Sequence, residues 1–290
     1  MRVRKRSFLA AVFLLASSVT YAQQTPPGKI IESLEREGCV ALESGKIKVC
    51  KYDYSSSGLL VEAVSFRPTG DGPFPGLLLI PGFQRTALDL IPLGVTLARE
   101  GFAAVAVSQP GFGKSLGKPD YVGPNTLKVL TEAFRKFERE PYVDAKRMGI
   151  YGYSRGAMAA SLLVVKLDDV RAAVFGAGIY DFRKAHDEVK IEGIRKNMES
   201  ETGMTDEAVR QRSSIFQMKN LKCPVLILHG EKDENVPVSQ ALLLRDQLTT
   251  LKKEFEIKLF ADRPHGIGPE VATYTLDFFK RKLIGDREKR

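Results

Sequence analysis

The sequence has few cysteines, few histidines, no tryptophan and no apolar run that could cross a membrane. Its 290 residues include three cysteines and three histidines. Three cysteines are too few for a scaffold that disulfides hold together. The one long apolar run, residues 8–19, has 12 residues, whereas a membrane-spanning helix needs about 20. The chain is therefore neither a disulfide-built miniprotein nor a polytopic membrane protein.

The composition is that of a folded domain. Hydrophobic residues make up 43 % of the chain and charged residues 27 %, which are globular values. The net charge of +9 is concentrated at the two ends: the first 22 residues hold four basic side chains and no acid, and residues 280–290 hold six basic and two acidic side chains. Because such tails are usually solvated ends, we expect no nucleic-acid partner.

The N-terminus has the three parts of a secretory signal peptide. Residues 2–6 are basic, the apolar run follows at 8–19, and residues 20–22 form a small-x-small cleavage site. We predict that residues 1–22 are removed and that the mature protein, starting near Gln23, is periplasmic or secreted without stable membrane insertion. The alternative is a short uncleaved anchor or a core helix.

Residues 23–53 are predicted to be an N-terminal extension with a hairpin. In a hairpin with a two-residue turn at Ser44-Gly45, each residue i of the first strand lies opposite residue 89 − i of the second. Cys39 is then opposite Cys50. Export would permit a disulfide between the two cysteines. Hydrogen-bonded and non-hydrogen-bonded residue pairs alternate along a hairpin, and counting from this turn predicts that Cys39 and Cys50 form a hydrogen-bonded pair with Cα atoms about 5.5 Å apart. The alternative is two free thiols on neighbouring strands. Cys223 begins an apolar strand and is predicted to be a buried free thiol.

From residue 54 onward, short apolar runs alternate with helical patterns. The runs lack polar alternation, as expected of strands covered on both faces. The predicted strands are 77–80, 103–107, 148–151, 172–175, 225–228 and 257–260, and the predicted helices are 88–99, 125–138, 157–166, 239–251 and 271–282. This pattern predicts an α/β domain over residues 54–290 with a mostly parallel, doubly wound sheet, preceded by two antiparallel strands, one within 61–66. The charged helical stretch 179–222 is predicted to be a small cap inserted between two strands.

A nucleophile motif lies where the predicted strand 148–151 meets a helix. Residues 152–156 read Gly-Tyr-Ser-Arg-Gly, which is G-x-S-x-G in a strand–turn–helix context. A sharp turn there exposes the Ser154 hydroxyl, and the two glycines remove β-carbons that would clash. Ser154 is therefore the candidate nucleophile.

A serine hydroxyl needs a base to become a nucleophile. His265 directly follows the last predicted strand, and Asp233 follows the strand before it. The order Ser154, Asp233, His265 is that of α/β-hydrolases, and all three lie on loops at the carboxyl edge of the predicted sheet. We expect His265 to be the general base and Asp233 to orient it.

Other histidines and acids compete for these roles. His229 is predicted to pack against its own loop, and His186, in the cap, to be a polar surface residue. Asp181 is the strongest rival acid because it also follows a strand. The weaker rival acids are Asp144 and Glu231.

An oxyanion hole needs two backbone N–H groups. One is expected from Arg155, directly after the nucleophile, and the other from Phe83, in the turn after strand 77–80. A second loop, residues 108–115, ends in Gly-Lys-Ser like a phosphate-binding loop. That motif needs glycine at the first position, where Ser108 stands, and Pro110 lacks an N–H. We therefore interpret it as a Gly-rich loop bordering a hydrolase site.

The segments 151–156, 213–225, 229–237 and 264–266 resemble the catalytic domain of prolyl oligopeptidase-type serine peptidases and the related dienelactone hydrolases. The resemblance covers roughly residues 54–282. It implies the α/β-hydrolase fold, with Ser154 as nucleophile, His265 as base and Asp233 as orienting acid. About thirty mature residues precede the domain, too few for a propeller. Dienelactone hydrolases often use cysteine as the nucleophile, so the serine favours peptidase or esterase chemistry.

These observations predict an exported serine hydrolase that cleaves an ester or amide bond, in a small-molecule ester or a short peptide, through an acyl-enzyme. A carboxylesterase or thioesterase of dienelactone hydrolase type is the alternative. A non-catalytic binding protein on a hydrolase fold is a further hypothesis, whose mark would be a broken triad. No cofactor and no metal are expected.

Overall fold

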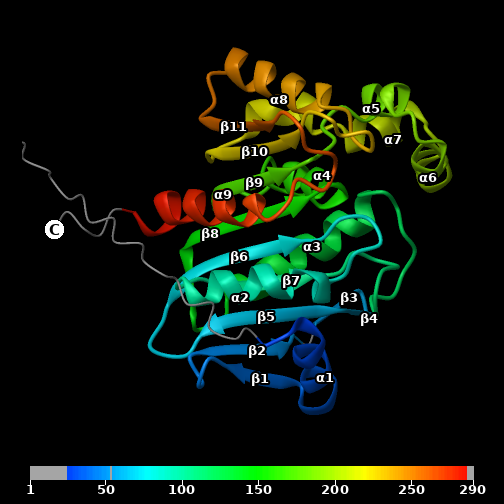
Figure 1. Ribbon diagram of the computed structural model, residues 1–290. Coiled ribbons are helices and arrows are strands. Elements are labelled where there is room, and N and C mark those ends of the chain that lie inside the picture. The colour runs from blue at the N-terminus through cyan, green and yellow to red at the C-terminus, as the bar shows by residue number, and fades with distance from the viewer. Residues whose placement is uncertain (1–24, 53, 286–290) are drawn as a thin grey trace, which may run out of the picture.

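A nine-stranded sheet runs through the molecule (Figure 1). The computed structural model describes residues 25–52 and 54–285, so the predicted signal peptide, residues 1–22, lies outside the described residues. The strand order is β1-β2-β5-β7-β6-β8-β9-β10-β11. The pairs from β1 to β7 are antiparallel, and every pair from β7 to β11 is parallel. This confirms the predicted mostly parallel, doubly wound sheet.

The strands form at the apolar runs. Their bounds are β1 Cys39–Leu42, β2 Ile47–Lys51, β5 Ala63–Pro68, β6 Phe74–Ile80, β7 Ala103–Val107, β8 Val143–Tyr153, β9 Val170–Gly176, β10 Val225–Gly230 and β11 Phe255–Phe260; β3 Tyr54–Ser56 and β4 Leu59–Val61 pair as a separate ribbon. β8 starts five residues before the predicted strand. Asp144 pairs with Pro75 and Met148 with Gly76, so residues 145–147 bulge at the sheet end, where polar side chains interrupt the apolar run.

Helices cover both faces of the sheet and close two apolar cores. The helices on one face are α1 Pro27–Glu37, α2 Ile91–Arg99 and α9 Glu270–Phe279, and those on the other are α3 Pro124–Glu138, α4 Arg155–Leu163 and α8 Ser239–Thr250. A 3₁₀ turn, η1 (Ala87–Leu90), precedes α2, and a π-helical turn, η3 (Lys280–Ile284), follows α9. The sheet is therefore buried on both sides, which agrees with its uninterrupted apolar strands.

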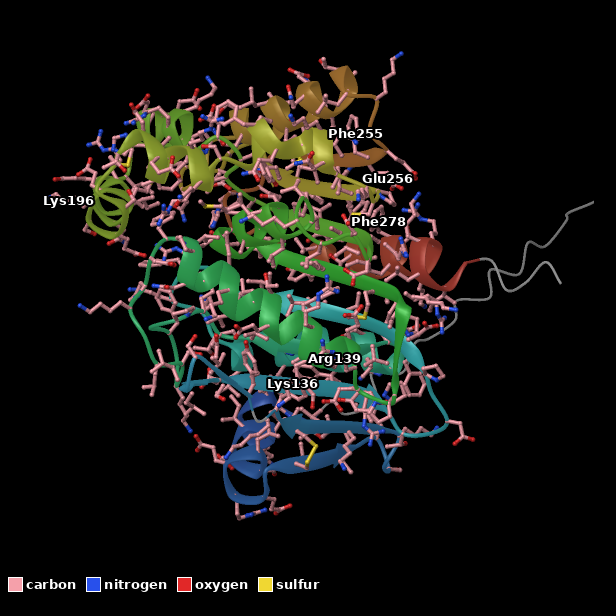
Figure 2. All side chains as sticks on the ribbon, turned by 180° about the vertical axis from the view of Figure 1, so that it is seen from behind. Lys136, Arg139, Lys196, Phe255, Glu256 and Phe278 are labelled. Atoms are coloured by element: carbon pink, nitrogen blue, oxygen red, sulfur yellow. A yellow bond between two sulfur atoms is a disulfide. The ribbon has the colours of Figure 1, made fainter. Side chains whose placement is uncertain are left out.

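The N-terminal hairpin has the predicted register and disulfide but not the predicted turn. Cys39 pairs with Cys50, and a disulfide joins them (Figure 2). The Lys51 N–H donates to the Gly38 carbonyl (2.7 Å), so the adjacent cysteine pair is the close, non-hydrogen-bonded type. Its Cα atoms are 4.0 Å apart. The expected hydrogen-bonded pair was wrong because the connection spans residues 43–46, which keeps the register but shifts the alternation by one position.

A helical segment lies between β9 and β10. It consists of α5 Phe182–Glu188, α6 Glu192–Thr202, α7 Asp206–Arg212 and the 3₁₀ turn η2 Ser214–Asn220. All residues from 177 to 224 are described, and none of them lies in a strand. Figure 1 shows α5, α6 and α7 together beyond the ends of β8 and β9. We call residues 179–222 the cap, as predicted from its charge and helical pattern.

Two smaller observations complete the fold. Cys223 is a buried free thiol, as predicted, and burial raises its pKa to about 12. In the described part of the chain, no helix combines the length and the apolar character that crossing a bilayer requires.

Candidate active site

Ser154 lies in the sharp turn between β8 and α4. Its backbone has φ 55° and ψ −122°, a conformation that residues other than glycine rarely adopt. A Cβ at position 152 would lie 2.1 Å from the Gly156 carbonyl oxygen, and one at position 156 would lie 2.1 Å from the Ile80 carbonyl oxygen. Glycine is therefore required at 152 for the turn to close onto the start of α4, and at 156 for the turn to pack against the end of β6.

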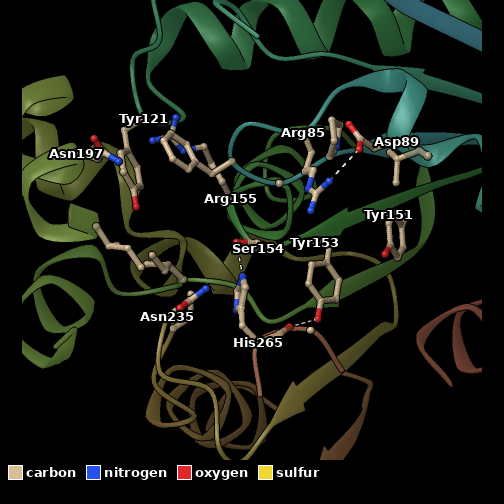
Figure 3. A pocket seen from close by; sticks show the side chains of 18 residues that line it. Arg85, Asp89, Tyr121, Tyr151, Tyr153, Ser154, Arg155, Asn197, Asn235 and His265 are labelled. Carbon is tan, nitrogen blue, oxygen red and sulfur yellow. Dashed lines mark hydrogen bonds and ion pairs between the residues drawn. The ribbon is translucent and has the colours of Figure 1, made fainter. Parts of the chain in front are cut away.

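The structure brings Ser154, His265 and Asp233 into one hydrogen-bonded chain (Figure 3). The Ser154 hydroxyl and His265 Nε2 are 2.9 Å apart. On the other side of the ring, His265 Nδ1 lies 2.8 Å from Asp233 Oδ2. A carboxylate only accepts, so Nδ1 carries the proton and Nε2 is free to accept the serine proton. Loops after β8, β10 and β11 supply the three residues, as the sequence predicted.

Asp233 is held as a carboxylate. Its side chain is fully buried, which alone would raise its pKa. The neighbouring His229 and His265 side chains, together with the Val236 N–H, outweigh burial and lower the Asp233 pKa to about 2. Oδ1 accepts from the N–H groups of Asn235 (2.9 Å) and Val236 (2.8 Å), which leaves Oδ2 for His265.

Tyr153 fixes the loop that carries His265, a role that sequence reasoning missed. Its hydroxyl donates to the His265 carbonyl and accepts from the Ile267 N–H (3.2 Å). The two rings also meet edge to face, with centroids 5.8 Å apart. Residue 153 is one of the unspecified positions of G-x-S-x-G, so the motif gave no indication of this contact.

The two expected oxyanion donors flank Ser154. Arg155 is the first residue of α4, and Phe83 follows β6 in the turn that packs on the nucleophile. A Cβ at Gly82 would lie 3.3 Å from Ser154 Cβ, so this turn touches the nucleophile directly. In the described part of the chain, neither the Phe83 N–H nor the Arg155 N–H donates to a backbone carbonyl. Neither group is therefore occupied by a backbone acceptor, and their role as oxyanion donors stays a prediction.

The competing residues have other partners. Asp181 caps α5 by accepting from the Lys184 N–H (3.1 Å). His229 Nε2 donates to the Val236 carbonyl (2.9 Å), so it packs on its loop as predicted, and it also lies 3.4 Å from Asp233 Oδ2. His186 pairs with acidic residues within the cap. Of the two weaker rivals, Asp144 pairs with Arg147, and Glu231 is exposed.

The Gly-rich loop after β7 borders the site, as predicted. Phe112 packs edge to face on Phe83, with ring centroids 5.6 Å apart. Glu62 occupies the concave side of the loop, where it accepts from the Ser108 hydroxyl (2.6 Å) and the Lys114 N–H (3.1 Å). The protein's own carboxylate thus fills the place that a phosphate would need.

Ser154 opens into a cavity of about 660 Å³. In Figure 3, Tyr121, Asn197 and Asn235 lie on one side of Ser154, and Arg85, Asp89 and Tyr151 lie on the other. The cavity also touches Ile179, Ile194 and Val236. The cap therefore contributes to the cavity wall through Ile179, Ile194 and Asn197. Among the described residues, no group of histidine, cysteine and acidic side chains is arranged to hold a metal ion.

Comparisons with known proteins agree with this fold. The chain is 27 % identical over 224 residues to the uncharacterized peptidase YtmA of Bacillus subtilis (strain 168), a match that covers 75 % of this chain and 86 % of that protein. It matches the larger uncharacterized peptidase YuxL of the same organism at 27 % identity, over 59 % of this chain and 27 % of that protein.

Two solved structures share the fold at low identity. The acylaminoacyl peptidase of Pyrococcus horikoshii has a TM-score of 0.74 at 20 % identity, covering 86 % of this chain and 44 % of that one. The acetyl xylan esterase from Paenibacillus sp. R4 has a TM-score of 0.71 at 16 % identity, covering 89 % and 93 %. The chain thus spans less than half of the acylaminoacyl peptidase but nearly all of the esterase.

The α/β-hydrolase sheet with a serine at its nucleophile turn defines the class: this chain is a serine hydrolase. The model of the prolyl oligopeptidase family matches residues 96–285, which is well over half of the chain, and the chain belongs to that family.

Proposed function

We propose that the chain is an exported hydrolase that cleaves an ester or amide bond by acyl transfer from substrate to Ser154 and then to water. The observation that carries this proposal is the hydrogen-bonded chain from the Ser154 hydroxyl through His265 to the buried Asp233 carboxylate. The strained serine backbone supports it, because such strain persists where the surrounding structure enforces it and gathers at functional sites.

The geometry supports each step of the proposed reaction. As Ser154 Oγ bonds to the substrate carbonyl carbon, its proton passes to His265 Nε2 and the carbonyl oxygen becomes an oxyanion. The N–H groups of Phe83 and Arg155 hold that oxyanion. When the bond to the leaving group breaks, His265 returns the proton to it. Water then attacks the acyl-serine, with His265 again taking and returning a proton, and Asp233 stabilises the imidazolium in both halves.

The size of the cavity supports a small-molecule ester or a short peptide as substrate. About 660 Å³ is within the range of small-ligand pockets. The chain covers 86 % of an uncharacterized bacterial peptidase and 93 % of an esterase. These coverages favour neither peptide nor ester cleavage over the other. A carboxylesterase or thioesterase is the second candidate within the same mechanism.

We also propose that the protein acts in the periplasm or outside the cell. The basic, apolar and small-residue segments of residues 1–22 support this assignment. The Cys39–Cys50 disulfide is independent support, because disulfides persist mainly in oxidising compartments.

Labelling with a fluorophosphonate tests the mechanism. The reagent should phosphonylate the wild-type protein at Ser154, and Ser154→Ala should abolish labelling and lower kcat by on the order of 10⁶. Ser200→Ala, which changes an exposed serine on α6, is the matched control and should keep full labelling. A folded Ser154→Ala protein that retains most of its ester hydrolysis would refute the proposal.

A further inference from the structure

The side chain of Arg155 is buried beside the nucleophile and paired with the cap. Its Nη2 lies 2.8 Å from Glu201 Oε1 and its Nη1 lies 3.2 Å from Oε2. The side chains of Arg155 and Glu201 are 3 % and 14 % exposed. Glu201 is on α6, 46 positions along the chain, so this ion pair connects the cap to the residue that follows Ser154.

Three aromatic rings pack around the Arg155 guanidinium. Its central carbon lies 3.9 Å from the ring centroid of Tyr121, 4.6 Å from that of Phe83 and 5.6 Å from that of Phe112. Such faces stabilise a cation but carry no charge. Among the described residues, Glu201 is the one acid within ion-pair distance of Arg155, so Glu201 alone balances its charge.

The cap also holds Tyr121 in a strained conformation. Tyr121 and Val122 have φ 44° and 59°, which is a rare region for residues other than glycine and an outlier for a β-branched one. Glu201 Oε2 accepts from the Tyr121 N–H (2.7 Å), and Arg212 Nε donates to the Tyr121 carbonyl (3.0 Å). The same carboxylate thus balances Arg155 and places the ring that covers it.

Arg155 and Tyr121 line the cavity on the side of the cap. We call this part the cap-side half of the cavity, and the other residues that line it are Ile179, Ile194, Asn197, Asn235 and Val236. It contains apolar and amide side chains and one cation whose charge is already neutralised. The opposite part of the cavity contains the charged side chains of Arg85 and Asp89. The ion pair between Glu201 and Arg155 therefore keeps the cap-side half electrically neutral.

We propose that Glu201 determines the specificity of the hydrolytic site: it masks the charge of Arg155, so that the cap-side half accepts an uncharged apolar or aromatic substrate group and rejects an anionic one. This inference rests on the proposed function. It names a substrate class, which is esters or short peptides whose group next to the cap has no carboxylate.

The test compares matched neutral and anionic substrates. One pair is the 4-nitrophenyl esters of hexanoic acid and adipic acid, which differ by a terminal carboxylate on the acyl group. The second pair is phenyl acetate and 3-carboxyphenyl acetate, which places that carboxylate on the leaving group. The measured quantity is the ratio of kcat/KM for the anionic ester to that for its neutral partner.

Glu201→Gln keeps the shape of the side chain and leaves the Arg155 charge unbalanced. In the pair whose carboxylate reaches the cap-side half, this ratio should rise by about tenfold or more, because two unit charges a few ångströms apart interact strongly in a poorly solvated site. Arg155→Met leaves the opposite charge, so the ratio should fall below the wild-type value. Glu199→Gln, an exposed acid on the same helix that pairs with His186, is the matched control and should leave the ratio unchanged.

A merely structural role for Glu201 would lower kcat/KM for both esters of a pair alike. If the wild type turns over these esters and neither Glu201→Gln nor Arg155→Met shifts the ratio in either pair, the specificity inference is wrong and the proposed function stands. If the wild type shows neither turnover nor fluorophosphonate labelling, the proposed function is wrong and this inference with it.

Discussion

Replacing Asp233 with asparagine removes the negative charge of the side chain and keeps its size and shape. Oδ1 accepts the N–H groups of Asn235 and Val236, so an asparagine is held with its oxygen on that side. Its NH₂ group then replaces Oδ2 and faces His265 Nδ1, 2.8 Å away. Because an NH₂ group only donates, His265 must carry its proton on Nε2, where it cannot accept the proton of Ser154.

We expect kcat for Asp233→Asn to fall by about 10⁴, the effect of holding a catalytic histidine in the wrong tautomer. The assay is steady-state hydrolysis of a 4-nitrophenyl ester, with circular dichroism to show that the variant is folded. Asp181→Asn is the matched control: asparagine caps a helix as well as aspartate does, so kcat should stay within about twofold. If Asp233→Asn retained more than about a tenth of wild-type kcat, or if Asp181→Asn were the more damaging change, the assignment of the acid would be wrong.

Three further outcomes are expected. Replacing Cys39 and Cys50 with serine should lower the free energy of unfolding by up to about 3 kcal/mol, because the disulfide closes a loop of about 12 residues; urea unfolding measures it, and an unchanged midpoint would contradict it. The hydrogen bond to Glu199 raises the pKa of His186 although partial burial opposes this. Protonated His186 therefore stabilises the folded state below about pH 6.5, and this contribution is lost as pH rises through the raised pKa. The Tm difference between wild type and His186→Gln should shrink from pH 6 to pH 9, and a constant difference would contradict the prediction. The Asp233 pKa of about 2 lies below the value in the unfolded chain. The free energy of unfolding should therefore fall by about 2 kcal/mol as pH falls from about 4 toward 2. An equal fall for Asp233→Asn and wild type would argue against this.

The central strands could be predicted because their signal is local. β7 occupies the predicted residues 103–107, where five consecutive buried residues are apolar. The boundaries were less predictable where pairing rather than hydrophobicity extends a strand. Val143 and Asp144 at the start of β8 pair with Phe74 and Pro75 of β6, and residues 145–147 then bulge before the apolar part of the strand begins. Nothing in the composition of this start indicates a strand.

The positions of Ser154, Asp233 and His265 could be predicted for a different reason. In a parallel sheet the carboxyl ends of the strands meet at one edge, so residues just after β8, β10 and β11 converge although they are far apart in sequence. The contacts that orient them do not follow from that rule. The Tyr153 hydroxyl on the His265 carbonyl, and His229 near Asp233 Oδ2, depend on side-chain directions that topology alone does not fix.

Arg155 shows where such reasoning stops. The role predicted for its backbone N–H comes from the motif, because the residue after the nucleophile supplies one of the oxyanion donors at such a turn. Its side chain contacts residues from three separate segments. These are Phe83 after β6, Tyr121 before α3 and Glu201 in the cap. A buried cation requires a partner, so the sequence could have raised the question of what balances an arginine at this position. Only the packing of the cap answers it: α6 brings Glu201 to Arg155, and no local pattern around either residue indicates that pairing.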